Sequence, residues 1–242
     1  QNQVDPPNRK IKRNICKDAN WMTMVVTSRT KPERIDFEYW NMDLIKKIIH
    51  NIPRYEVKLI CKILLECALR PSEARCLTLD DLLNFDASSN LPPIIDINKS
   101  VKSGTKKIGD PKTDNGFRQL VISNDLRDEI NKYVKTLPKD QNYLFLDKTN
   151  SPIRLEAIIR GIDKSLNKLH LTLPIKRKGY FFRHYTASFW AYTSKYKNAI
   201  DLAKALGDKS IDFVQDNYIA LYLKSEKEVE NVDYQNKHFN WK

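Results

Sequence analysis

The stretch GYFFRHYTASFW, residues 179–190, places an arginine and a histidine inside an aromatic run. At helical spacing its apolar residues lie nearly all the way round, which is the pattern of a buried helix. A guanidinium buried there without an anion would face a desolvation cost of several kcal/mol. Arg183 therefore needs either a carboxylate from the protein, such as Glu73, or a phosphate from a ligand. The stretch alone leaves both alternatives open.

A second arginine stands where the chain must leave helical geometry. Residues 57–68 have the apolar spacing of a long buried helix, and Pro71 suits the first turn of the next short helix. The proline ring disfavours helical geometry for the preceding residue, so we expect Arg70 at a junction between two helices. Two guanidinium groups can form forked, charge-assisted hydrogen bonds to the non-bridging oxygens of one phosphate.

A lysine lies beside a turn signal in the middle of the chain. Residues 94–101 and 117–122 are strand-like, and Asn115-Gly116 between them is a two-residue hairpin signal. The pattern predicts a small antiparallel sheet with a hairpin whose near arm is residues 111–113. Lys112 on that arm could deliver a proton to a leaving group. Because the surrounding stretch is rich in lysine, a solvated face is the alternative.

The rest of the pattern is mostly helical. Apolar spacing between residues 44 and 49 indicates an amphipathic helix that ends before Pro53. Further helices are predicted over about 125–136, 155–169, 180–193, 198–206 and 210–223. The expected fold class is mainly α with a small antiparallel β-sheet (α+β). Its expected parts are a basic arm or interdomain linker over 1–37, a main domain over 38–223 and a C-terminal tail over 224–242.

The composition points to a polyanionic partner. There are 42 Lys and Arg against 30 Asp and Glu, a formal net charge of +12, which favours nucleic acid as the partner. The 4 cysteines form no CxxC and have no nearby His pair, so neither a disulfide framework nor a zinc site is indicated. No apolar stretch approaches the length of a membrane span. We expect an intracellular protein that binds nucleic acid and is not associated with a membrane.

Four separated stretches then belong together: ALRPSEARCLTLDDL (68–82), PKTDNGFRQLVIS (111–123), FFRHYTAS (181–188) and ALGDKSIDFVQDNY (205–218). Their order and spacing resemble the catalytic domain of the tyrosine recombinases, the phage and transposon integrases and their chromosome-dimer-resolving relatives. The resemblance runs from about residue 40 to 225. It implies that residues 38–223 are a catalytic domain.

The resemblance also assigns roles to particular residues. It implies that Arg70 and Arg183 bind the phosphate, that Glu73 completes the L-R-x-S-E pattern, and that Lys112 is the hairpin lysine. Tyr218, eleven residues beyond Gly207, matches the nucleophile, and Tyr222 is the rival. A phenol has a pKa of about 10, so nearby cations would help the phenolate form.

The implied activity is site-specific DNA strand exchange. The tyrosine would form a 3′-phosphotyrosine link and release a 5′-OH, with no metal, cofactor or external energy source. The implied partners are double-stranded DNA and further copies of the chain, as a dimer to tetramer on DNA, with the C-terminal tail docking on a neighbouring protomer. The alternatives are a type IB topoisomerase or telomere resolvase with the same chemistry, and a non-cutting DNA-binding relative.

Two positions depart from the family pattern. Tyr180 stands where His or Lys is common, and its phenol can still donate to a phosphate oxygen. Asp208 stands where His or Trp is common, and an ionised carboxylate cannot donate. Either Asp208 turns away, for example to orient an arginine, or Lys209 takes the donor role. His184 follows the second arginine as in the family, and packing and phosphate contact are equally expected for it.

Basic side chains gather in two regions that could contact the DNA backbone. Residues 99–118 carry six basic residues against two acidic ones, and residues 174–184 carry no acidic residue. Neutralising phosphates gives affinity whatever the base sequence. The expected DNA-binding residues are Lys99, Lys102, Lys106, Lys107, Lys176, Arg177, Lys178 and Lys209.

Overall fold

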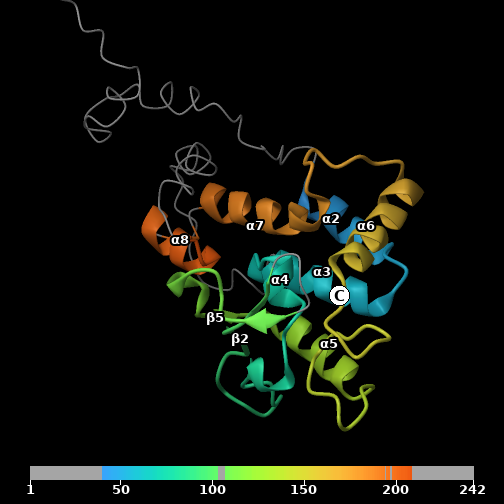
Figure 1. The fold of residues 1–242 in the computed structure, drawn as a ribbon. Helices are drawn as coiled ribbons and strands as arrows, with labels where there is room; N and C mark the ends of the chain where they lie inside the picture. The colour runs from blue at the N-terminus through green and yellow to red at the C-terminus, as the bar shows by residue number, and fades with distance from the viewer. Residues whose placement is uncertain (1–39, 103–106, 194, 197, 209–242) are drawn as a thin grey trace, which may run out of the picture.

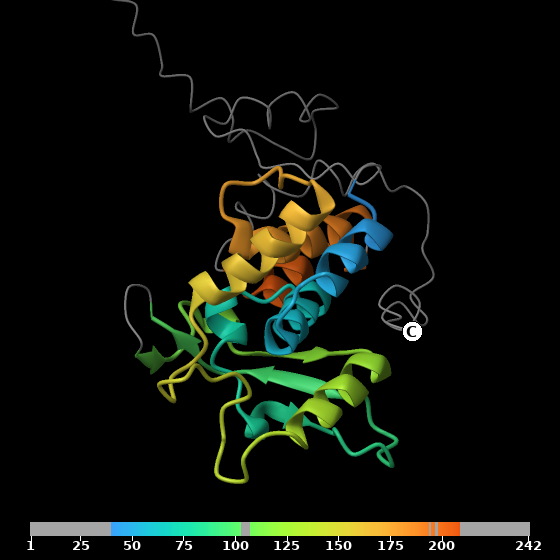
Figure 2. The same ribbon diagram turned by 90° about the vertical axis from the view of Figure 1, so that its right-hand side faces the viewer.

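The computed structural model describes residues 40–102, 107–193, 195–196 and 198–208. Figures 1 and 2 place helices α2 (Met42–His50), α6 (Leu155–Leu169) and α7 (Phe181–Tyr192) on one side of the molecule. A small sheet and helix α5 (Asn124–Val134) lie on the other side. Helix α3 (Tyr55–Cys67) and the single turn α4 (Pro71–Ala74) lie between the two parts. The expected class, mainly α with a small antiparallel sheet, is confirmed.

Helix α3 is the centre of the core. It packs against α2, α5, α6 and α7. Its apolar residues from Val57 to Cys67 are buried, whereas Tyr55, Lys58 and Lys62 keep one stripe of the helix partly exposed. Helix α7 is the main neighbour across the core, and its aromatic side chains Phe181, Phe182, Tyr185 and Trp190 are buried as its sequence predicted.

The main sheet has three antiparallel strands in the order β1-β2-β5, which are Leu82–Leu83, Ile94–Ile97 and Arg118–Val121. The register pairs Ile95 with Leu120 and Ile97 with Arg118. Since side chains alternate along a strand, Arg118 lies on the same face as the buried Leu120. An arginine on the buried face of a strand requires an anionic partner.

The predicted hairpin at Asn115-Gly116 is wrong. The hairpin is instead formed by β3 (Ser100–Val101) and β4 (Ile108–Gly109), while Asp114–Gly116 form a 3₁₀ turn (η3). Two side chains of this segment, Thr113 and Asn115, hydrogen-bond to the end of helix α8 (Ala199–Leu206). These tertiary contacts replace the two-residue turn that the local sequence favours.

Three short 3₁₀ elements, η2 (Leu79–Asp81), η3 and η4 (Lys178–Tyr180), complete the described part of the chain. The predicted helices over 125–136, 155–169, 180–193 and 198–206 correspond to α5, α6, α7 and α8. The helix predicted over 210–223 lies outside the described residues. Within the described residues, no helix has both the length and the apolar character to cross a membrane. Cys61, Cys67 and Cys76, which lie in the described part of the chain, are buried and form no disulfide with one another.

Candidate active site

Arg70 is held at the junction between α3 and α4. Ala68 has a left-handed backbone (φ 49°) that ends α3, and Arg70 is extended (ψ 143°) because Pro71 opens α4. The Arg70 backbone N–H donates to Oε2 of Glu73 (2.9 Å), and its Nη1 donates to Oε1 (2.7 Å). One carboxylate therefore fixes both the backbone and the side chain of Arg70.

Glu73 also binds a second arginine, Arg118 of β5. Arg118 Nη2 and Nη1 lie 2.9 and 3.3 Å from the two carboxylate oxygens, and Nε donates to Ala205 O (2.9 Å). Burial by itself would raise the pKa of Glu73, but Arg118, Arg183 and Arg70 outweigh it and lower the pKa to about 2. Glu73 is thus an ionised, buried carboxylate that joins α4, β5 and α8.

The end of α8 is the next part of the site. Gly207 caps the helix with a left-handed backbone (φ 68°), a conformation that glycine adopts without steric cost. Its carbonyl accepts from Arg70 Nη2 (2.7 Å) and Thr113 Oγ1 (3.1 Å). Asn115 Nδ2 donates to Asp208 O (2.9 Å). Residues 113–118 therefore dock on the end of α8, directly beside Arg70.

Arg183 reaches the same place from α7. Its side chain is 6% exposed, and it donates from Nη1 to Ala68 O (2.6 Å) and from Nη2 to Leu206 O (2.8 Å). Nη2 also donates to Oδ2 of Asp208 (3.0 Å). The anion that the buried Arg183 required is thus a carboxylate of the protein. It is Asp208, whereas Glu73 is bonded to Arg70 and Arg118.

Asp208 joins the two guanidinium groups. Its Oδ1 lies 2.5 Å from Arg70 Nη2, and its Oδ2 lies 3.0 Å from Arg183 Nη2. Burial by itself would lower the pKa of Arg70, but Glu73 and Asp208 outweigh it, so the pKa is raised. Two arginines from distant parts of the sequence therefore converge on one anionic group at the end of α8.

This arrangement can bind an oxyanion. Each arginine directs an Nη2 group to a single shared position, and charge-assisted bonds of this kind are about twice as strong as neutral ones. Backbone carbonyls and Glu73 hold both guanidinium groups in place before any ligand arrives. Such preorganised donors also stabilise negative charge that builds up during a reaction.

Comparisons with known proteins define the fold. No family model and no curated protein matches the chain. Among solved structures, the Tn1549 transposon integrase in complex with circular intermediate DNA is similar at a TM-score of 0.60 and 19% identity, covering 88% of this chain and 68% of that one. The XerH site-specific recombinase bound to difH substrate has a TM-score of 0.55 and 18% identity, covering 81% and 53%. The XerA recombinase is similar at a TM-score of 0.52 and 15% identity, covering 82% of this chain and 62% of that one.

The chain has the fold of the tyrosine recombinase catalytic domain. Three of the four stretches singled out in the sequence lie within the described residues, together with residues 205–208 of the fourth. Those around Arg70, Lys112 and Arg183 meet at the end of α8, at the start of the fourth stretch. Tyr218, the predicted nucleophile, and its rival Tyr222 lie outside the described residues, as do Lys106 and Lys209.

Two predicted neighbours of the arginines lie at the start of α7. Tyr180 is the N-cap residue of the helix, and its ring lies 6.5 Å from that of His184, centre to centre. Both side chains are half-buried. Their position beside Arg183 in the recombinase fold is compatible with packing and with a phosphate contact.

Lys112 lies on the segment that docks on α8. Its side chain is exposed, and the next residue, Thr113, bonds to the Gly207 carbonyl that also accepts from Arg70. The lysine is therefore on the arginine side of the molecule, although it follows the β3–β4 hairpin and does not form an arm of one.

The basic residues predicted to bind DNA fall into two groups. Lys102, Lys107, Lys176 and Arg177 are exposed. Lys178 pairs at the surface with Asp163 (2.6 Å). Lys99 differs, because its Nζ lies 2.6 Å from Oδ1 of the buried Asp81, and only 22% of its side chain is exposed. The structure thus gives Lys99 a partner inside the protein.

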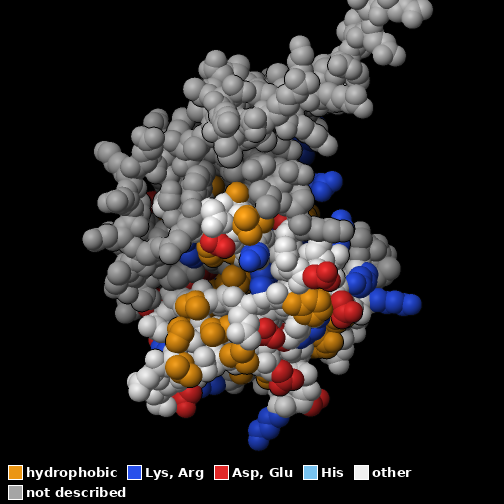
Figure 3. Space-filling view, turned by 90° about the vertical axis from the view of Figure 1, so that its left-hand side faces the viewer, with side chains coloured by type: hydrophobic (Ala, Val, Ile, Leu, Met, Phe, Trp, Pro, Cys, Tyr) orange, Lys and Arg blue, Asp and Glu red, His pale blue; other side chains and the backbone are white. Residues whose placement is uncertain are grey.

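The face of the molecule that carries α8 and β5 is mixed in character. Figure 3 shows basic and acidic side chains next to one another near the centre of this face, with hydrophobic side chains over much of its lower part. Among the exposed hydrophobic residues are Phe117 (52%), which precedes β5, and Val121 (45%), which ends it. Within the described residues, no group of three or more His, Cys, Asp and Glu side chains could hold a metal ion.

Sequence reasoning missed one member of the cluster and left another undecided. Arg118 was part of a quoted motif but received no role, although its alternation with Leu120 marks it as an arginine on a buried face. For Asp208, orientation of an arginine was one of the alternatives, and the structure bonds it to both arginines.

Proposed function

We propose that this chain is a site-specific DNA recombinase that cleaves and rejoins DNA strands through a tyrosine–phosphate link. The observation that carries the proposal is the convergence of Arg70 and Arg183 on one anionic position, with Nη2-to-oxygen distances of 2.5 and 3.0 Å. Two preorganised guanidinium groups suit the two non-bridging oxygens of a phosphodiester. The recombinase fold adds support, and the integrase and recombinase named above were solved with DNA.

In the proposed reaction, Tyr218 loses its phenolic proton to solvent, and the phenolate oxygen attacks phosphorus while Arg70 and Arg183 hold the phosphate. The bond between phosphorus and the 5′ oxygen of the next deoxyribose breaks as the bond between phosphorus and the tyrosine oxygen forms. The products are a 3′-phosphotyrosine and a 5′-hydroxyl. Lys112 gives its proton to the leaving oxygen. A 5′-hydroxyl of another strand reverses the step, so the phosphodiester energy is conserved without an external source or a metal.

Other side chains support this step by position. In the proposal His184 and Tyr180, whose rings lie 6.5 Å apart at the start of α7, donate to a phosphate oxygen. Lys102, Lys107, Lys176, Arg177 and Lys178, together with Lys106 and Lys209, would contact the DNA backbone. In this proposal residues 38–223 are the catalytic domain, residues 1–37 are a basic arm or linker, and the tail over 224–242 contacts a neighbour in a dimer or tetramer on DNA.

One observation favours a second candidate, a DNA-binding relative that does not cut. Asp208 stands where the family commonly has a donor, and its carboxylate is bonded to both arginines. A protein locked in that arrangement could bind DNA through its basic surface without holding a phosphate between the arginines.

A covalent-trapping experiment separates the two candidates. Sites that the chain selects from random duplex DNA are rebuilt with a nick next to the cleavage position, so that the released strand end is lost and the adduct accumulates. We expect an adduct with the unaltered chain and with Tyr222→Phe, none with Tyr218→Phe, and DNA binding in all three. An equal adduct with Tyr218→Phe would refute the nucleophile, and no adduct on any selected site would favour the non-cutting relative.

Lys112 has its own arm in this experiment. The Lys112→Ala variant should still form the adduct, but more slowly. A substrate with sulfur in place of the leaving oxygen should restore its rate, because a thiolate leaves without needing a proton. Equal slowing on both substrates would contradict the role of Lys112 as proton donor.

A further inference from the structure

The hydrogen-bonding capacity of the two Nη2 groups is already used. Each Nη2 carries two N–H bonds. Arg70 Nη2 donates to Gly207 O (2.7 Å) and Asp208 Oδ1 (2.5 Å), and Arg183 Nη2 donates to Leu206 O (2.8 Å) and Asp208 Oδ2 (3.0 Å). The two carbonyls are part of the α8 terminus. The carboxylate of Asp208 is therefore the exchangeable acceptor at the position that both arginines share.

A carboxylate and a phosphodiester present the same features to this pair of donors. Each has two oxygens that share one negative charge, so each suits the forked geometry of guanidinium groups. They cannot occupy the position together, because two like charges at such a distance repel. Whichever anion is present excludes the other.

We propose that Asp208 is an internal phosphate mimic, which occupies the phosphate position between Arg70 and Arg183 in the DNA-free chain and must leave before a phosphodiester binds there. This inference rests on the proposed function for its biological meaning. It adds to that function a residue that controls access to the arginine pair. In the enzyme, DNA would be cleaved only after it has displaced this carboxylate.

The surroundings of Asp208 allow its side chain to leave while its backbone stays in place. Its N–H donates to Ala203 O (2.9 Å) and its carbonyl accepts from Asn115 Nδ2 (2.9 Å), so the main chain is fixed at both groups. The side chain is 12% exposed. In this proposal the side chain leaves by rotation about its own bonds, while the cap of α8 at Gly207 stays in place.

The effect on binding follows from competition at one position. The apparent dissociation constant for an external anion equals the intrinsic one divided by the fraction of molecules in which the position is open. If the carboxylate fills the position about nine-tenths of the time, its removal should tighten binding about tenfold. A residue that merely oriented the arginines would have the opposite effect, since its removal would weaken the site.

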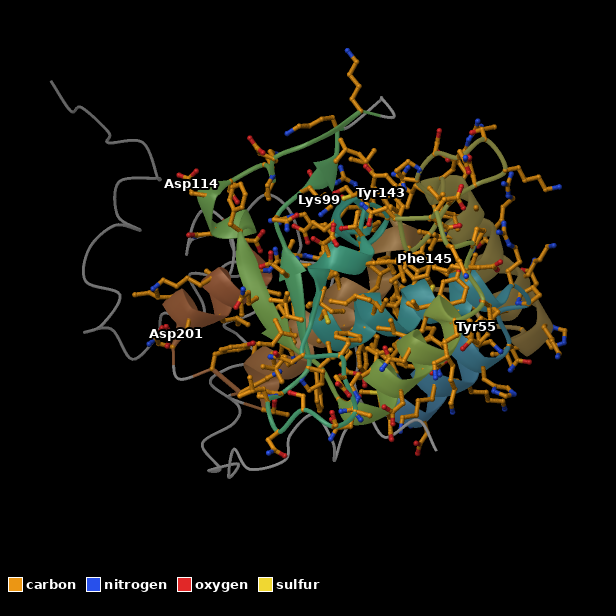
Figure 4. All side chains as sticks on the ribbon, turned by 90° about the horizontal axis from the view of Figure 1, so that it is seen from below. Tyr55, Lys99, Asp114, Tyr143, Phe145 and Asp201 are labelled. Atoms are coloured by element: carbon orange, nitrogen blue, oxygen red, sulfur yellow. The ribbon has the colours of Figure 1, made fainter. Side chains whose placement is uncertain are left out.

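The test uses the full chain and dimethyl phosphate, the smallest phosphodiester, in a titration followed by the arginine Nε–H signals in NMR spectra. Asp208→Asn keeps the shape of the side chain and removes its charge. Asp114→Asn makes the same charge change at an exposed residue of η3, an element that packs against α8. Figure 4 shows Asp114 on the same side of the molecule as Asp201 of α8.

We expect Asp208→Asn to bind dimethyl phosphate about tenfold or more tightly than the unaltered chain, and Asp114→Asn to bind within about twofold of it. Should Asp208→Asn unfold, as judged by circular dichroism, Asp208→Ser carries the same expectation. Unchanged or weaker binding by the folded variant would overturn the proposal, as would an equal gain in Asp114→Asn. The titration involves no DNA, so its outcome is independent of whether the chain forms a covalent adduct.

Discussion

Replacing Glu73 with glutamine should destabilise the protein strongly. The Glu73 side chain is 2% exposed and carries the charge that offsets Arg70 and Arg118, whose side chains are 17% and 7% exposed. Glutamine preserves the volume but removes the negative charge. Arg118 would then be a buried cation without its main ion-pair partner, and Arg70 would lose the group that fixes it.

Two independent arguments give the size of the stability loss expected for Glu73→Gln. Removing one partner of a buried ion pair costs about 3–5 kcal/mol. The pKa of Glu73 is lowered from 4.5 to about 2, and each pKa unit corresponds to about 1.4 kcal/mol, so the charged form contributes about 3 kcal/mol. We therefore expect Glu73→Gln to lower the free energy of unfolding by about 3 kcal/mol at pH 7.

The pH dependence supplies a second signature. Because the pKa is lower in the folded protein, the unfolded chain binds the proton more readily as the pH falls. The stabilisation by Glu73 is therefore complete above a pH of about 4.5 and is lost as the pH falls towards 2. The difference in unfolding free energy between the unaltered chain and Glu73→Gln should shrink across this interval.

Urea denaturation at a series of pH values measures both quantities. The matched control is Glu56→Gln on α3, a 39% exposed carboxylate whose oxygen lies 3.7 Å from Arg54. It should change stability by less than about 0.5 kcal/mol. A loss below about 1 kcal/mol for Glu73→Gln, or a loss that does not depend on pH below 4.5, would refute the buried-charge argument.

Three further substitutions test other parts of the account. Gly207→Ala should cost about 1–2 kcal/mol, measured by urea unfolding, because the backbone φ is 68° and a Cβ would lie 2.6 Å from Arg118 Nη1; an unchanged stability would contradict this. Ser123→Ala should cost about 2 kcal/mol in the same assay, because the hydroxyl caps α5 and donates to the buried Glu66; a loss no larger than that of Ser151→Ala, at a half-buried serine, would count against it. Arg177→Ala should lower by about 1 the slope of log DNA affinity against log salt concentration, without changing stability. Lys99→Ala should instead destabilise the protein and leave that slope unchanged, because Lys99 pairs with buried Asp81. The reverse pattern would contradict both assignments.

Much of the helical frame could be predicted because its signals are local. Pro71 restricts the residue before it, so the extended geometry of Arg70 followed from the sequence (ψ 143°). The apolar circumference of residues 181–192 likewise fixed the burial of Arg183 and its need for an anion. Local rules of this kind hold wherever tertiary contacts do not compete with them.

The features that the sequence could not predict are those that depend on contacts between distant parts of the chain. Asn115-Gly116 is a hairpin signal in isolation, but Thr113 and Asn115 bond to the end of α8 and hold a 3₁₀ turn instead. The ion pair of Lys99 with the buried Asp81 could not be predicted either, because the lysine-rich stretch around Lys99 indicates only a solvated face. Which carboxylate would meet Arg183 was likewise a tertiary question, because Glu73 and Asp208 both end close to the arginines.

The proposed phosphate site between Arg70 and Arg183 is tested most directly by a structure of the chain trapped covalently on a nicked DNA site. We expect a phosphorus atom bonded to the oxygen of Tyr218, with non-bridging oxygens about 3 Å from the guanidinium nitrogens of both Arg70 and Arg183. The Asp208 carboxylate should have turned out of that position. A phosphate held by only one of the two arginines, or a link to another residue while Asp208 still bridges the pair, would contradict it.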